Sequence, residues 1–473
     1  MKLKTSNFLL DNKGLLKEII ERLSQNYNYV SILGIDVSGG SYVFGTSGTV
    51  VGPSRDAQRG FVLRVFQDCG FSEYSFNEID VDLICKKMNE IAKEDRKAFL
   101  ECGKGLHYSN QPEDSELQIF DVGEAEILPG EEDANGIIKS FTEAHDSIKA
   151  KYSELVQLTL TVSATQVNKL FLSTNRDLYQ SYVYATGYGI AYASGSNGVK
   201  QEFMATSGLC SFELAKQIPA LAEVAAKRAV ELLSAEKLVP GEYDIICDPD
   251  FTGLIAHEAF GHGAEMDMFV KHRAKGQEYM NKRVASDLIN MHDGASAANE
   301  VSSYLFDDEG NLASDTRIIV KGILKSGMCD ELSALQLNVA PTGNGKRESY
   351  KRKAYTRMTN TFFEEGEDSL DDMMASIKHG YLLEGFSSGM EDPKNWGIQC
   401  VASKGREIKD GKLTGKIVSP VYLTGYVPDL LESISSVSPG LKLCGSGYCG
   451  KGWKEWVKTS TGGSYIKARG KLS

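Results

Sequence analysis

Two histidines and a glutamate lie close together in the middle of the chain, as His257, Glu258 and His262 in the pattern HExxxH. Imidazoles are common ligands of catalytic zinc, and a neighbouring carboxylate can take a proton from the water that the metal activates. The chain has only seven histidines, so the pattern has a low chance frequency. The alternative is a buried helix whose histidines are satisfied by other polar groups, with Glu258 in a surface ion pair. We favour the zinc site.

The spacing of the two histidines poses a geometric problem. The common zinc motif, HExxH, is one residue shorter. At about 100° per residue, positions five apart on a regular α-helix differ by roughly 140° and cannot face one ion. Glycines at 261 and 263 permit either a π-bulge or an early end of the helix. We therefore predict an irregular turn between residues 257 and 263.

The residues before the motif indicate how it is positioned. Residues 243–247 (YDIIC) have the composition of a strand. Asp248 is a good N-cap, and Pro249 suits the first helical position. The sequence thus predicts that a helix begins near Asp250 and carries the motif.

A catalytic zinc usually has three protein ligands, so one is still to be found. The segment 445–452 is rich in glycine and would let a cysteine approach a metal closely. Spacing alone leaves several candidates open: His272, His292, Glu265, Asp267, Cys444 and Cys449.

The fold class predicted from the whole chain is α+β, with a mixed α/β domain over residues 1–238. Apolar spacing predicts helices near residues 75–100, 132–152 and 212–238, and residues 156–162 alternate as a strand. The last of these helices should end near a Pro-Gly pair, where we place the domain boundary.

Residues 239–473 are predicted to form a β-rich, mostly antiparallel domain that carries the metal-site helix. Its short β-rich runs are separated by Gly, Asn and Asp, and Asp410-Gly411 is a hairpin signal. Two short helices are expected near residues 368–379 and 428–435.

Composition restricts the partners. The chain has 473 residues and 52 basic against 64 acidic side chains, a net charge of −12, which argues against binding to a nucleic-acid backbone. No apolar run is long enough for a signal-peptide core or a membrane span, so we expect a cytoplasmic protein. The nine cysteines are odd in number and lack CxxC pairs, which argues against disulfides.

Several longer motifs in the second half resemble the TldD/PmbA family of zinc metallopeptidases, and in particular its motif-bearing TldD-type branch. The motifs are HEAFGHGAE (257–265), FDDEG (306–310), VKGILKSGMCD (320–330), PTGNGKRESY (341–350), TRMTNT (356–361) and CGKG (449–452), with a weaker match at RGFVLRVF (59–66). An older name for this family is modulator of DNA gyrase.

The resemblance implies a zinc site with His257, His262 and Cys449 as ligands and Glu258 as the base. Here the late motif reads CGKGW, where the family has CGKxGQ. The family also implies an enclosed site in a dimer, either a homodimer or a heterodimer with a sister subunit that lacks the motif. Unfolded or small peptides would be the substrates.

Three further side chains are candidates around the site. Arg347 and Arg357 lie in motifs that resemble the family and would bind a peptide backbone or a carboxylate. Glu265 would orient a ligand imidazole. The function expected is thus that of a zinc peptidase. The alternative is a non-catalytic binding or assembly protein with a structural metal, and Glu258 distinguishes the two because a closed structural site needs no base.

Overall fold

The computed structural model describes residues 1–67, 70–101, 116–452 and 454–473. Cys69, Cys102 and Trp453 lie outside the described residues. The predicted α+β class is confirmed, with ten α-helices among the described residues and a β-rich second half. The strands of the first half and those of the second half form separate sheets.

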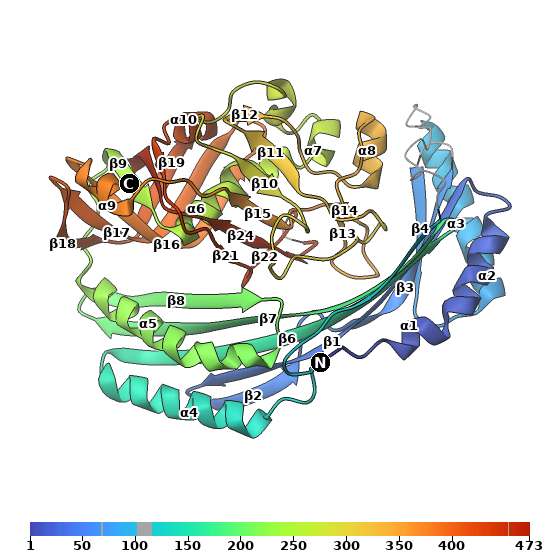
Figure 1. Cartoon of the computed structure of the whole chain (residues 1–473), viewed down its shortest axis with the longest axis horizontal. Helices are drawn as coiled ribbons and strands as arrows, with labels where there is room; N and C mark the ends of the chain where they lie inside the picture. Colours follow the sequence, from blue (N-terminus) through green and yellow to red (C-terminus); the bar gives the residue numbers. More distant parts are fainter. Residues whose placement is uncertain (68–69, 102–115, 453) are drawn as a thin grey trace.

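The first half is built on one eight-stranded sheet in the order β4-β3-β1-β6-β7-β5, with β2 added to β1 and β8 added to β7. Neighbouring strands are antiparallel except β5 and β7, so the sheet is mixed. Figure 1 shows it as a long curved layer beneath the second half. The strands are β1 (Tyr29–Gly45), β2 (Gly48–Pro53), β3 (Gln58–Gln67), β4 (Gly70–Phe76), β5 (Leu117–Val122), β6 (Leu155–Ser173), β7 (Arg176–Gly195) and β8 (Gly198–Gly208).

Helices cover both ends of this sheet (Figure 1). At one end lie α1 (Asn7–Asp11), α2 (Lys13–Leu23) and α3 (Val81–Glu101), and at the other lie α4 (Ala134–Lys151) and α5 (Ile218–Glu231). The helix predicted from residue 75 begins later, because residues 70–76 pair with β3 as β4. The helical stretch predicted over 212–238 consists of η1 (Phe212–Gln217), α5 and η2 (Leu232–Ser234).

The second half contains two larger sheets. One has the order β12-β11-β10-β15-β24-β21; the other has the order β16-β9-β25-β19-β17-β18, with β20 added to β25. Most pairs are antiparallel, as expected, but β9 with β16 and β15 with β24 are parallel. Asp410-Gly411, both at positive φ, connects β17 to β18 and confirms the predicted hairpin.

The strands of these sheets are short except for β16 and β17. Their bounds are β9 (Gly241–Cys247), β10 (Met291–Asp293), β11 (Thr316–Val320), β12 (Ile323–Leu324), β15 (Asn360–Phe363), β16 (His379–Asp392), β17 (Gly397–Lys409), β18 (Lys412–Val418), β19 (Val421–Tyr426), β20 (Ser436–Val437), β21 (Lys442–Cys444), β24 (Ser460–Gly463) and β25 (Ile466–Leu472). Two-stranded pairs are formed by β13 (Gly345–Lys346) with β14 (Tyr355–Thr356) and by β22 (Tyr448–Cys449) with β23 (Val457–Lys458).

The helices of the second half are short. The two predicted ones are present as α9 (Leu370–Ala375) and α10 (Val427–Glu432). The others are α6 (Pro249–Leu254), η3 (Ile255–Gly261), η4 (His262–Ala264), α7 (Asp267–Val270), η5 (Lys275–Tyr279) and α8 (Glu331–Leu337). Nearly all side chains of the stretch from α6 to η4 are buried in the largest apolar core, which positions this stretch firmly.

Buried charges join the two halves. Arg347 pairs with Glu73 at 2.6 Å between Nη2 and Oε1, and its side chain is 1% exposed. Arg64 on β3 pairs with both Glu73 and Glu309. Burial opposes the ionisation of Glu73, but Arg347 and Arg64 outweigh it and lower its pKa to about 2. The division predicted between residues 238 and 239 falls between η2 and β9 and stays a prediction.

No described helix combines the length and the apolar composition needed to cross a bilayer. The seven cysteines that the structure describes are all free thiols. For these seven cysteines, this agrees with the prediction from number and spacing.

Replacing Arg347 with alanine should lower the free energy of unfolding by about 3 kcal/mol, because a buried carboxylate, Glu73, loses its main partner. The matched control is Arg352→Ala, since Arg352 is half exposed and 3.9 Å from Glu348, and its loss should cost about 0–1 kcal/mol. Urea denaturation of both variants measures the difference. Equal midpoints would contradict the importance of the buried pair.

Candidate metal centre

The helix that carries the motif starts as predicted. Asp248 is the N-cap of α6, and its carboxylate accepts a hydrogen bond from the Phe251 amide at 2.8 Å. Pro249 occupies the first helical position. The same carboxylate also accepts from the Gly385 amide at 2.9 Å, which ties the start of the helix to β16.

The two histidines are brought together by a π-helical turn. Residues 255–261 form η3, and the His262 amide donates to the carbonyl of His257, five residues earlier. This wider turn places both histidines on one side, as the spacing required. A side chain at Gly261 would meet the sulfur of Met358, so glycine is needed where the turn packs. The predicted irregular turn is confirmed as a π-helix.

His257, His262 and Cys449 converge. One donor atom from each lies within 4.8 Å of the other two. Cys449 Sγ is 3.5 Å from His262 Nε2, and the two imidazole centroids are 5.1 Å apart with their planes at 86°. Among the described residues, no other group of three His, Cys, Asp or Glu side chains meets this geometry.

The charges of the cluster favour a thiolate. Burial disfavours ionisation of Cys449, but His262 and His257 outweigh it and hold its pKa well below the usual value. Burial also disfavours a charged His262, yet Cys449 and Glu265 raise its pKa well above the usual value. Each of the two groups thus favours the charged form of the other. A thiolate is the form of cysteine that binds metals.

Glu265 orients His262 from the side of the ring that faces away from Cys449. Its Oε2 lies 3.2 Å from His262 Nδ1, which leaves Nε2 free to face Cys449. Glu265 is 2% exposed and lies 3.3 Å from Lys451 Nζ and 3.5 Å from Arg357 Nε. Burial opposes its ionisation, but Lys451, His262 and Arg357 outweigh this and keep its pKa far below the ordinary value. Glu265 therefore fixes the ring orientation of His262 as a carboxylate.

Two contacts hold the strand that carries Cys449. Arg357, fully buried, donates from Nη2 to the Cys449 carbonyl at 2.8 Å. The hydroxyl of Tyr448 donates to Asp56 of the first half at 2.8 Å. The backbone of β22 is thus fixed from both halves of the chain, and this directs the Cys449 sulfur at the histidines.

Glu258 stands beside the cluster. Its Oε2 is 4.0 Å from His262 Nε2, and its side chain is 19% exposed. Gly389 of β16 packs against its Cγ, where a larger side chain would collide with it. This partly open position suits a carboxylate that handles a proton next to the three converging donors.

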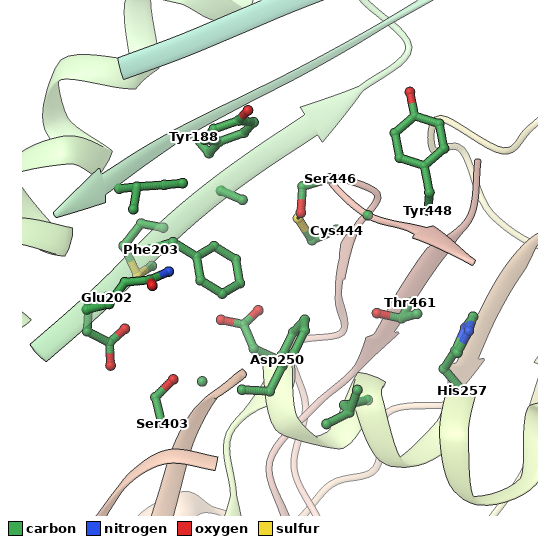
Figure 2. A pocket seen from close by; sticks show the side chains of 18 of the residues that line it. Tyr188, Glu202, Phe203, Asp250, His257, Ser403, Cys444, Ser446, Tyr448 and Thr461 are labelled. Atoms are coloured by element: carbon green, nitrogen blue, oxygen red, sulfur yellow. The ribbon is translucent and has the colours of Figure 1, made fainter. Parts of the chain in front are cut away.

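A cavity of about 390 Å³ opens from this cluster toward β8 of the first half. His257 and Glu258 line it at one side, and Figure 2 shows His257 and Asp250 on the same helical stretch. Cys444 and Tyr448 also line it. The sulfur of Cys444 lies 3.6 Å from Ser446 Oγ rather than in the three-residue cluster.

The remaining candidates have other partners. His292 uses both ring nitrogens, at 2.6 Å from Asp315 and 2.8 Å from Glu364. His272 bonds to Gln277. Asp267 pairs at 2.8 Å with Lys451, which also pairs with Glu265, so Asp267 is a partner of that lysine and not of the histidines. Arg347 is engaged by Glu73, as described above, and does not line the cavity that opens from the cluster.

Sequence reasoning missed several side chains around the cavity. Asp250 precedes His257 by seven residues, two helical turns, so its place on the same face could have been inferred. Lys451 follows Cys449 by two residues and was overlooked as the partner of Glu265. Glu202 and Arg228 line the cavity from the first half, and no pattern in the sequence indicates that they meet the motif helix.

The donor set fits zinc. Two imidazoles and a thiolate are ligands that zinc prefers, and three protein ligands leave a position open. His257 Nδ1 is buried and has no hydrogen-bond partner within the described part of the chain.

Known proteins resemble this chain most clearly over its second half. A family model described as the PmbA/TldA metallopeptidase C-terminal domain matches residues 240–469. A protein of Methanothermobacter thermautotrophicus named metalloprotease is 30% identical over 281 residues, 59% of this chain and 61% of that protein. The zinc metalloprotease TldD homolog of Saccharolobus solfataricus is 30% identical over 246 residues, 51% of this chain and 54% of that protein.

The Buchnera aphidicola (Acyrthosiphon pisum) metalloprotease TldD homolog is 34% identical over 220 residues, 46% of this chain and 45% of that protein. The chain therefore matches about half of the length of such relatives, or slightly more.

Solved structures match the fold of the whole chain. A Thermotoga maritima protein described as a candidate modulator of a DNA gyrase has a TM-score of 0.73 at 15% identity, covering 98% of this chain and 100% of that chain. TldE from Thermococcus kodakarensis has a TM-score of 0.72 at 16% identity, covering 97% and 100%. The C-terminal domain model and the relatives named TldD place residues 240–469 in the TldD/PmbA family, and the solved structures show that the whole chain has the fold of these proteins.

Proposed function

We propose that this protein is a zinc-dependent peptidase that hydrolyses unfolded or small peptides, with His257, His262 and Cys449 as zinc ligands. The observation that carries the proposal is the convergence of these three donors beside Glu258 and at the end of a cavity. Relatives named metalloprotease and zinc metalloprotease support the same class of activity.

Zinc in such a site supplies a Lewis acid and an acidic water for attack on a peptide carbonyl. Glu258 would accept the proton of the attacking water and pass it to the leaving amine. Its carboxylate is 4.0 Å from His262 Nε2, so this base would stand directly beside the residues that would hold the metal. Glu265 and Arg357 would keep His262 and Cys449 in place during turnover.

A thiolate ligand adds negative charge and weakens a metal as a Lewis acid relative to a neutral third ligand. Lys451 and Arg357 lie behind Glu265 and place positive charge near the cluster. These two cations would offset part of the charge of the thiolate and of Glu265 without touching the substrate.

We further propose that the protein works as a dimer, either with itself or with a sister subunit that lacks the motif. The fold match to TldE supports a partner of this type. An assembly that encloses the cavity would admit extended chains and exclude folded proteins.

Replacing Glu258 with glutamine should lower peptide cleavage by about 10²–10⁴-fold while zinc content stays the same, because glutamine cannot accept the proton. Elemental analysis and cleavage of an unfolded casein fragment measure the two quantities. Retained zinc with unchanged cleavage would contradict the peptidase mechanism and favour a structural metal.

Replacing Cys449 with serine should remove most of the bound zinc, since a thiolate ligand is lost. Cys444→Ser is the matched control, because Cys444 lies five residues earlier and outside the cluster, and it should keep zinc at the level of the parent protein. Zinc-to-protein ratios after dialysis against a weak chelator test this. Equal zinc in both variants would exclude Cys449 as a ligand.

A further inference from the structure

The cavity beside the metal centre carries more acidic than basic groups. Its ionisable lining includes the carboxylates of Glu202, Asp250 and Glu258 and the guanidinium of Arg228. Glu258 already has a role as the proposed base. The carboxylates of Glu202 and Asp250 and the guanidinium of Arg228 therefore remain for contact with a substrate.

Asp250 lies at a fixed distance from the zinc ligands. It is on the first turn of α6, seven residues before His257, and Figure 2 shows both residues projecting from that stretch. Seven residues at 1.5 Å each place Asp250 about 10 Å from His257 along the helix. This is within reach of a long side chain whose backbone is held near the metal.

Glu202 faces the cavity from β8, on the opposite wall. It is only 3% exposed, and its Oε1 has no hydrogen-bond partner in the part of the chain that the structure describes. A buried carboxylate oxygen without a partner is costly unless a ligand supplies one. The neighbouring cation Lys404 is shared with two other carboxylates, Glu231 and Glu384.

Desolvation raises the pKa values of both carboxyl groups above their ordinary range. Burial raises the pKa of Glu202, and Lys404 and Arg228 offset the rise only in part. Desolvation by the surrounding protein also raises the pKa of Asp250 in spite of Arg228 and Lys442, although Asp250, unlike Glu202, is exposed to solvent. A cation that entered the cavity would stabilise both carboxylates.

Part of the remaining lining is apolar. It includes Ile190, Phe203, Met204, Leu254 and Phe386. Phe203 of β8 and Phe386 of β16 meet edge to face at 5.9 Å, so both halves of the chain contribute to this wall. An apolar wall that ends in carboxylates matches a side chain with an aliphatic stem and a charged head, as in lysine and arginine.

We propose that this cavity is a specificity subsite for a lysine or arginine side chain within two residues of the cleaved bond, with Asp250 and Glu202 binding the charged head. The inference rests on the proposed peptidase function and names the substrate class for that site. It assigns no chemical step to either carboxylate.

The test uses peptides that differ in one side chain: lysine against norleucine, and arginine against citrulline, each placed in turn at the two positions on either side of the cleaved bond. Cleavage by the zinc-loaded protein gives kcat/KM, and anisotropy of labelled peptides with the zinc-loaded Glu258→Gln variant gives Kd. At one of these positions, the charged member of each pair should be favoured about tenfold in both measurements.

Asp250→Asn and Glu202→Gln should each reduce this ratio severalfold, and the second variant keeps the test valid if the first does not fold. Asp371→Asn is the matched control, because it makes the same change in the first turn of α9, another six-residue helix, and Asp371 does not line the cavity. It should leave the ratio as in the parent protein. Circular dichroism verifies the fold of each variant.

The outcomes separate the two proposals. Cleavage and binding without preference for the charged peptides would overturn the subsite and leave the peptidase function intact. A preference in binding without cleavage of any peptide would overturn the peptidase function and support the subsite. A ratio that survives both carboxylate substitutions would overturn the assignment to Asp250 and Glu202.

Discussion

Two imidazoles five residues apart have to face the sulfur of a cysteine almost 190 positions later, and a regular α-helix cannot present them. The π-helical turn of η3 brings the two imidazoles to one side, because the His262 amide donates to the His257 carbonyl and not to the carbonyl one residue later. Contacts from Arg357 and from Asp56, a residue of the N-terminal half of the chain, fix β22 and so direct the Cys449 sulfur at the imidazoles. The sheets and their packing serve mainly to bring these two short segments together.

The centre is also a network of charged groups in which each group stabilises the next. Cys449 and His262 stabilise each other's charged forms, Glu265 holds His262, and Lys451 with Arg357 holds Glu265. Cys449, Glu265 and Arg357 are buried, and His262 and Lys451 are about one fifth exposed, so removing one charge would leave its neighbours poorly compensated. Lys451 and Cys449 come from the same short motif. A single loop therefore supplies both a donor to the cluster and the cation that stabilises Glu265.

Local patterns in the sequence predicted much of this arrangement. The Asp248-Pro249 cap, the irregular turn, the β17-β18 hairpin and most of the helices follow from short-range chemistry, and the structure confirms them. Spacing did not choose between Cys444 and Cys449, because they lie five residues apart and only tertiary packing decides which sulfur faces the histidines. Arg347 illustrates the opposite case. Its motif suggested contact with substrate, but its partner Glu73 lies 274 positions away, and no local pattern indicates such a contact.

The tight fit around Gly261 has a practical meaning for protein engineering. Transplanting the three donors onto the straight helices of a designed bundle would not reproduce the centre, because the widened turn and its glycine-sized gap beside Met358 would be missing. A host scaffold would need to accommodate one surplus residue within a buried helix and to bring in an extended segment from the other side. A transplant would therefore have to include the π-helical turn and the residues that pack around it, and not only His257, His262 and Cys449.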